Sequence, residues 1–176
     1  MRTGGVVSVC AAVMAACAAW AAAQDAGQPA TAPVAAVMKL GEGVTEVVWN
    51  RGEIDRLGEF YAENVVRHVP ESPDPVVGLE ANKEYIRRMR AAFPDTHVTT
   101  ERAFTDGEMA AVYWVWSGTH LGDLPNLPAT GRKVTLPGIS MIRIENGKFA
   151  EIWDQDDQLS LLIQLGVVQL PPPSPR

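Results

Sequence analysis

The sequence predicts an α+β domain in which a curved antiparallel sheet wraps around three helices. Apolar residues follow a helical period in the first half of the chain, whereas period-two alternation with Asp-Gly and Asn-Gly turns dominates the second half. A run of helices followed by a run of strands is typical of this class. The length of 176 residues suits one core and is short for two, so we expect a single domain.

Three helices are expected before most of the strands. The first spans residues 34–50 and ends at Asn50-Arg51-Gly52; the second spans 54–61, and the third spans 79–93 and ends before Pro94. A short final helix is expected over 157–165, where Gly166 ends it.

Five strands are expected from alternation and turn chemistry. One precedes the third helix, and four follow it as antiparallel hairpins, at residues 64–69, 96–105, 109–120, 134–144 and 148–155. Prolines between residues 70 and 75, and Gly and Pro between residues 121 and 133, predict two irregular loops.

The two ends of the chain predict export and flexible tails. Arg2, an apolar stretch over 6–20 and Ala21-Ala22-Ala23 predict a signal peptide over residues 1–23, and hence a periplasmic or secreted protein. A retained membrane anchor and a lipid attached at Cys17 are the alternatives. We expect a tether over 24–34, the folded domain over 35–168 and a disordered tail over 169–176.

Composition excludes several classes of function. Cleavage after residue 23 removes both cysteines, which excludes disulfides and cysteine nucleophiles from the mature chain. It also leaves 14 basic against 21 acidic residues, a net charge of −7 that disfavours nucleic acid as a partner. No phosphate-binding glycine loop and no Gly-x-Ser-x-Gly motif is present.

One strand carries large aromatic residues on a single face. Alternation over residues 109–120 places Trp114, Trp116 and His120 together with Val112, opposite Tyr113. The two indoles either fill the core, which is the commoner fate of tryptophan, or form the wall of a pocket.

The strand over 148–155 ends in acidic residues. Alternation places Ile152, Asp154 and Asp156 opposite Trp153, so acids share a face with an apolar side chain. A carboxylate in a desolvated pocket has a raised pKa suited to proton transfer, and Asp154 and Asp157 are our candidates. The alternative is that these acids are solvated and that Asp157 caps the final helix.

Histidines offer a second set of polar groups. His68 and His120 each end an expected strand and are expected to face inward. The histidines lack the spacing of a zinc site, so no metal is implied.

Several stretches together resemble the SnoaL-like polyketide and ester cyclases of the nuclear transport factor 2-like superfamily. The resemblance runs from about residue 44 to residue 168. It rests on Val48-Trp49-Asn50-Arg51-Gly52, Ala92-Phe93-Pro94-Asp95, Gly118-Thr119-His120, Pro128-Ala129-Thr130-Gly131-Arg132, Arg143-Ile144-Glu145-Asn146-Gly147-Lys148, Glu151-Ile152-Trp153-Asp154 and Gln164-Leu165-Gly166.

The resemblance implies a cone-shaped fold, often dimeric, with a pocket between helices and sheet. It implies acid/base catalysis without metal or cofactor on a small hydrophobic carbonyl compound, with Asp154 or Asp157 transferring the proton and His68 or His120 donating to the enolate oxygen. The predicted substrate-binding residues are Trp49, Tyr61, Trp114, Trp116, Met141 and Trp153. The competing hypothesis is an exported binding module of the same fold without catalysis.

Overall fold

The computed structural model describes residues 33–169. The predicted signal peptide, all but the last two residues of the predicted tether and all but the first residue of the predicted tail lie outside the described residues. Within residues 33–169, no helix is long and apolar enough to cross a membrane.

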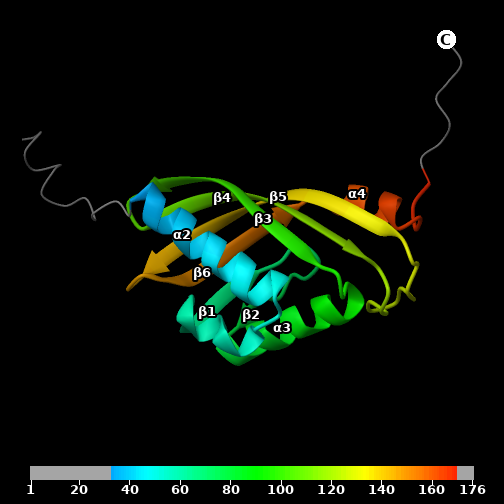
Figure 1. The fold of residues 1–176 in the computed structure, drawn as a ribbon, viewed down its shortest axis with the longest axis horizontal. Coiled ribbons are helices and arrows are strands. Elements are labelled where there is room, and N and C mark those ends of the chain that lie inside the picture. The colour runs from blue at the N-terminus through cyan, green and yellow to red at the C-terminus, as the bar shows by residue number, and fades with distance from the viewer. Residues whose placement is uncertain (1–32, 170–176) are drawn as a thin grey trace, which may run out of the picture.

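The described chain forms a six-stranded sheet with helices packed against it (Figure 1). The strands lie in the order β2-β1-β6-β5-β4-β3. In chain order the elements are α2 (Val34–Val44), η1 (Thr45–Asn50), η2 (Ile54–Glu59), β1 (Tyr61–His68), β2 (Val76–Val77), α3 (Leu79–Ala92), β3 (His97–Asp106), β4 (Met109–Thr119), β5 (Lys133–Glu145), β6 (Lys148–Asp156) and α4 (Gln158–Gln164).

The predicted fold class is confirmed, with one change in the sheet. All neighbouring strands pair antiparallel except β1 and β6, which run parallel and bring His68 beside Trp153. The sequence could not reveal this pairing because about 80 residues separate the two strands, whereas the antiparallel hairpins are marked by local turns such as Asn146-Gly147.

The inner face of the sheet follows from period-two alternation. Along β5, buried and exposed residues alternate without interruption from Lys133 to Ile142, because every second side chain points toward the helices. The same alternation buries Val112 and Trp116 on β4 and Ile152 and Asp154 on β6. This face, with its two tryptophans and its acid, is the one that the helices cover.

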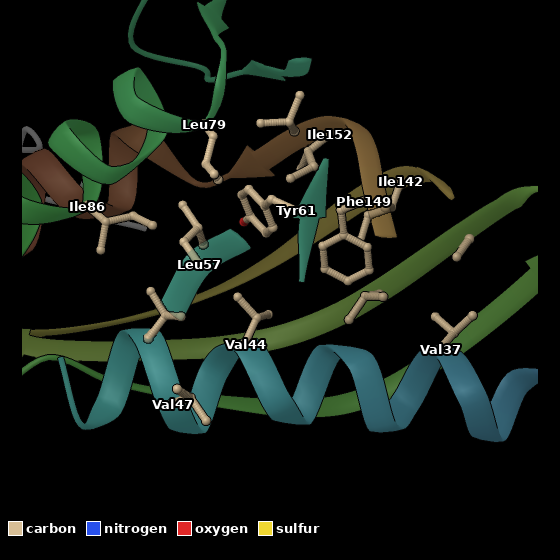
Figure 2. Close-up of a cluster of buried hydrophobic side chains, with 14 residues drawn as sticks. Val37, Val44, Val47, Leu57, Tyr61, Leu79, Ile86, Ile142, Phe149 and Ile152 are labelled. Carbon is tan, nitrogen blue, oxygen red and sulfur yellow. The ribbon is translucent and has the colours of Figure 1, made fainter. Parts of the chain in front are cut away.

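The main core lies between α2, α3 and the inner face of the sheet, as Figure 2 shows. Val37 and Val44 lie on the same face of α2, two helical turns apart, and both belong to the cluster that contains Tyr61, Phe149 and Ile152. A second buried cluster around Phe93, Trp116 and Leu136 lies toward α4. Helices therefore contact both ends of the sheet but leave space between the two clusters.

Three local features differ from the sequence prediction. The first predicted helix, 34–50, is an α-helix only to Val44 and continues as the π-helical turn η1; the second is the shorter 3-10 helix η2. The strand β2, only two residues long and close to Pro75, carried too little pattern to be predicted. None of these differences moves a residue to another face of the sheet.

Candidate active site

A cavity of about 1100 Å³ lies between the inner face of the sheet and the helices. Its walls are mostly apolar and come from all the helices of the described chain but η2, from all six of its strands and from the loops over residues 69–72 and 123–127. Enclosed, largely apolar cavities with a few polar groups are typical of small-molecule sites. At this volume the cavity can hold a molecule of several fused rings.

One end of the cavity contains a buried ion pair. Arg67 on β1 donates from Nε to Asp154 Oδ2 at 2.7 Å, and its Nη2 forms an ion pair with the same oxygen at 2.6 Å. Ser140 on β5 donates to Asp154 Oδ1 at 2.5 Å, and Ser140 Oγ in turn accepts from Trp114 Nε1 at 2.8 Å. Arg67, Ser140 and Asp154 are all buried, so this network fixes the Asp154 carboxylate in one orientation.

Aromatic rings flank the guanidinium of Arg67. Its Cζ lies 5.5 Å from the ring centroid of Trp49 and 4.9 Å from that of Tyr85, distances typical of cation–π contacts. Burial opposes the charge of Arg67, but Asp154, Tyr61 and Tyr85 together outweigh burial and raise the pKa of the guanidinium. Arg67 therefore stays charged inside the cavity wall.

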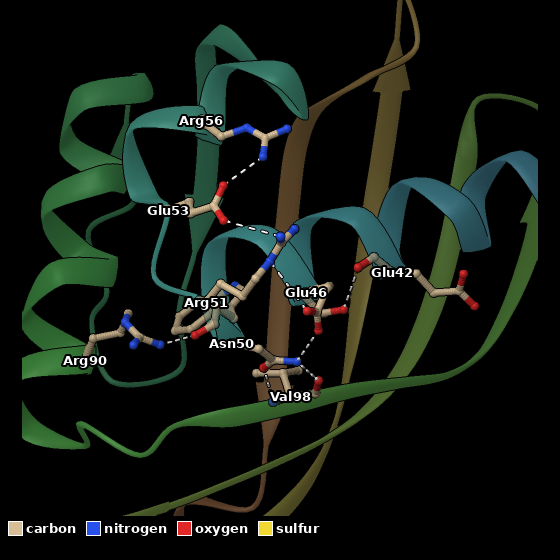
Figure 3. Close-up of polar contacts among 10 residues, drawn as sticks. Glu42, Glu46, Asn50, Arg51, Glu53, Arg56, Arg90 and Val98 are labelled. Atoms are coloured by element: carbon tan, nitrogen blue, oxygen red, sulfur yellow. Dashed lines mark hydrogen bonds and ion pairs between the residues drawn. The ribbon is translucent and has the colours of Figure 1, made fainter.

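Contacts of Asn50 and Arg90 hold the backbone around Trp49, and Figure 3 shows these two residues together with Val98. Asn50, the next residue, accepts from the Val98 amide at 2.7 Å and donates to the Val98 carbonyl at 3.0 Å, which ties η1 to β3. Arg90 on α3 donates to the Trp49 carbonyl. The backbone of Trp49 thus lies where η1, β3 and α3 meet.

Asp156, two residues beyond Asp154, lines the same end of the cavity. Gln158 donates to its Oδ1, and within residues 33–169 no hydrogen bond is found to its other oxygen. Burial raises the pKa of Asp156, and the negative charges of Glu71, Asp154 and Asp157 act in the same direction. A carboxylate of this kind is suited to take up and release a proton.

Four of the six predicted binding residues line the cavity, namely Trp49, Tyr61, Trp114 and Trp116. Met141 and Trp153 do not. They are paired with each other across β5 and β6 on the outer face of the sheet, because alternation turns Trp153 away from Asp154. These two predictions rested on residue type rather than on strand parity.

The predicted acids are separated by the structure. Asp154 is buried in the cavity wall, whereas Asp157 is exposed, lies outside the cavity and accepts from the Ser160 amide at 2.9 Å as the N-cap of α4. The capping alternative therefore describes Asp157, and the cavity alternative describes Asp154.

Neither predicted histidine lines the cavity. His68 lies on the outer face, stacked on Trp153 at 5.3 Å and within 3.0 Å of Glu151. His120 is fully buried, as expected, but it packs against Phe93 and contacts Thr130 rather than the cavity, and burial lowers its pKa. His68 faces outward because its neighbour Arg67 faces inward.

Comparison with known proteins identifies the family. The sequence profile of the SnoaL-like polyketide cyclases matches residues 42–165, which include the ion pair and nearly all residues that line the cavity. The chain belongs to the SnoaL-like polyketide cyclase family. The resemblance seen in the sequence is thereby confirmed.

Two characterised relatives of this SnoaL-like protein are ester cyclases. It is 29% identical over 124 residues to the aklanonic acid methyl ester cyclase DauD of Streptomyces sp. strain C5, which covers 67% of this chain and 74% of that protein. The aklanonic acid methyl ester cyclase DnrD of Streptomyces peucetius is also 29% identical, over 67% of this chain and 83% of its own.

A solved structure shares the fold of this SnoaL-like protein. TsrD from Streptomyces laurentii superposes with a TM-score of 0.69 and 28% identity, over 78% of this chain and 99% of that one. Membership of a cyclase family favours the enzyme hypothesis over the binding module.

The polar residues that contact or accompany Asp154 in the cavity wall were not predicted as site residues from the sequence, namely Arg67, Ser140 and Asp156. Asp156 could have been chosen, since it shares a face with Asp154. Arg67 could not have been chosen from the sequence, because it reaches Asp154 only through the parallel pairing of β1 with β6. Among residues 33–169, no group of three or more His, Cys, Asp or Glu side chains is placed to hold a metal ion.

Proposed function

We propose that this protein is a cyclase that closes a ring by an intramolecular aldol reaction in a hydrophobic carbonyl compound. The observation that carries this proposal is the pair of carboxylates, Asp154 and Asp156, on one face of β6 in an otherwise largely apolar cavity. The names of the relatives DauD and DnrD support the same type of reaction.

The substrate class follows from the size and lining of the cavity. A volume of about 1100 Å³ exceeds the need of a single ring. Trp49, Tyr61, Trp114 and Trp116 offer flat apolar surfaces, against which fused aromatic rings pack well. We therefore propose a polycyclic aromatic ketone or ester.

The reaction needs one group that accepts and returns a proton. A carboxylate removes a proton from the carbon next to a carbonyl, and the C–H electron pair becomes the double bond of an enolate. The enolate carbon then attacks a second carbonyl carbon of the same molecule, forming a C–C bond, and the resulting alkoxide recovers a proton from the carboxylic acid. The product is an isomer of the substrate, so no oxidant or reductant enters.

We assign the proton transfer to Asp156. Both oxygens of Asp154 accept hydrogen bonds from buried groups, so its role is to hold Arg67 in place. Asp156 keeps one oxygen without a hydrogen-bond partner among the described residues, and burial raises its pKa. A stronger base is the better acceptor for a carbon acid.

The test uses aklanonic acid methyl ester, the compound in the names of the relatives, together with a set of polycyclic β-keto esters. Cyclisation is followed as a product of unchanged mass and new retention time, and proton removal as exchange of the α-hydrogen in D₂O. We expect Asp156→Asn to lower kcat by about 10²- to 10⁴-fold. In the wild type, kcat/KM should rise with pH as Asp156 loses its proton, and the midpoint of this rise should lie above 3.8, the ordinary pKa of an aspartate. The rise should be absent in Asp156→Asn.

Asp157→Ser is the matched control, because serine keeps the N-cap of α4 and the residue lies outside the cavity. It should retain a kcat close to that of the wild type, and the rise of kcat/KM with pH should move slightly to lower pH, because the charge of Asp157 helps to raise the pKa of Asp156. If wild-type protein neither exchanges nor cyclises any of these compounds, the proposed function is wrong. If Asp156→Asn keeps full activity, the assignment of the base is wrong.

We also propose that the protein is a homodimer that associates through the outer face of the sheet. One row of paired residues crosses this face from β1 to β3: His68, Trp153, Met141, Ala111 and Phe104. Met141 is 52% exposed and Phe104 67% exposed. Together with the exposed Tyr113 and Ile139, this row forms an apolar surface that a second copy would cover.

A further inference from the structure

The cavity contains a positively charged donor whose hydrogen-bonding capacity is only partly used. Among the described residues, four buried side-chain atoms lack a hydrogen-bond partner: Arg67 Nη1, Asn82 Oδ1, Thr100 Oγ1 and His120 Nε2. Only Arg67 and Thr100 belong to residues that line the cavity. Unpartnered buried polar groups are rare in folded proteins, and a functional role is one of the explanations for them.

The geometry of the ion pair explains why one nitrogen is left over. Asp154 Oδ2 accepts a hydrogen bond from Nε and forms an ion pair with Nη2, so it occupies the edge of the guanidinium that these two nitrogens form. Nη1 carries two further N–H groups at the end of the guanidinium, and no oxygen of the described chain accepts from them. The rings of Trp49 and Tyr85 lie against the guanidinium and restrict its orientation.

Charge decides what kind of group suits this donor. Arg67 and Asp154 cancel each other's charge. The other charged residues that line the cavity are Arg88 against the acids Glu71, Asp123 and Asp156, so the balance is negative. A substrate carboxylate would meet this negative charge on entry. A neutral carbonyl oxygen meets less opposition, and it gains from Arg67 as negative charge develops on it.

We propose that Arg67 is the electrophilic catalyst of the reaction, donating from Nη1 to the carbonyl oxygen that becomes the enolate oxygen. The proposal rests on the proposed function and replaces the histidines, which do not line the cavity. Asp156 takes the proton from carbon, the C–H pair moves into the C–C double bond, and the carbonyl π pair moves to oxygen, where Arg67 stabilises it. Asp154 is a positioning residue that orients the guanidinium.

The first experiment uses the variant Arg67→Lys, which keeps a positive charge beside Asp154 but lacks the Nη1 donor. We expect kcat to fall by about 10²- to 10³-fold, as for the loss of one oxyanion donor. KM should change much less, because the donor acts mainly on the developing charge. Thermal unfolding of the variant shows whether it is folded; a folded variant with wild-type kcat would contradict the proposal.

The second experiment uses the unaltered protein and therefore does not depend on the folding of a variant. The probe is 2-naphthol, whose ionised oxygen resembles an enolate oxygen on a fused ring system. We expect the guanidinium N–H resonances of Arg67, observed in protein labelled with ¹⁵N-arginine, to shift on saturation, and the naphthol to ionise at a lower pH when bound. Unchanged Arg67 resonances with naphthol bound in the cavity would overturn the proposal.

The two proposals can fail separately. A naphthol response at Arg67 without turnover of any carbonyl compound would overturn the cyclase proposal and leave Arg67 as the oxyanion donor of some other reaction. Turnover that requires Asp156 but not Arg67 would retain the cyclase and remove Arg67 from its chemistry.

Discussion

At the scale of single residues, strand parity decides the role of each polar group. Arg67 and His68 are neighbours on β1, yet one is buried beside Asp154 and the other stacks on Trp153 on the outer face. Histidine is the residue type that chemistry suggests first, but it is arginine that reaches the cavity. A guanidinium can remain charged when buried, provided that a carboxylate pairs with it.

His120 gives a prediction at the same scale. Burial lowers the pKa of His120 in the folded protein below the ordinary value of 6.5, which the unfolded chain keeps. At a pH between the folded and the unfolded pKa, the unfolded chain therefore binds a proton that the folded chain does not. The free energy of unfolding should therefore decrease as pH falls from about 7 to 5. Urea unfolding at both values should show a smaller decrease in His120→Gln than in the wild type; equal decreases would contradict this account.

At the scale of elements, a glycine on β5 makes room for an aromatic wall. Gly138 is paired with Trp114 on β4, and a Cβ at this position would lie 2.2 Å from the indole Cη2. The missing side chain allows the indole to lie flat across β5 and to donate to Ser140. The glycine thus links the shape of the cavity to the network around Asp154.

This contact predicts the effect of Gly138→Ala. The added methyl group must displace the indole, which should destabilise the fold by about 1–3 kcal/mol and weaken the bond to Ser140. Trp114→Phe removes the ring atoms that collide, so the double variant should lose less stability than the two single changes together. Chemical unfolding of all four proteins measures this coupling, and strictly additive losses would exclude the collision.

The elements themselves could be predicted well where the signals are local. Asn146-Gly147 and alternation fixed the β5–β6 hairpin, and the same alternation placed Trp114, Trp116 and Asp154 on the inner face. The site was predicted less completely, because Arg67 joins it through a pairing between distant strands. Met141 and Trp153 were chosen as aromatic or apolar residues, although their parity already placed them outside.

At the scale of the whole molecule, the apolar row on the outer face predicts the oligomeric state. Replacing Met141, in the middle of the row, by Glu would place a charge twice in a two-fold interface. Light scattering coupled to size-exclusion chromatography should give the mass of a dimer for the wild type and the mass of a monomer for Met141→Glu. Val77→Glu, an exposed apolar position on β2 outside the row, should stay dimeric, and a monomeric wild type would refute the interface.

The parallel contact between β1 and β6 also determines when the site can form during folding. Arg67 and Asp154 lie 87 residues apart in the chain, so their ion pair closes a long loop, whereas the hairpins from β3 to β6 close short ones. During synthesis, Arg67 leaves the ribosome well before its partner exists. We therefore expect the ion-pair end of the cavity to be completed late, after the hairpins have formed, when β1 pairs with β6.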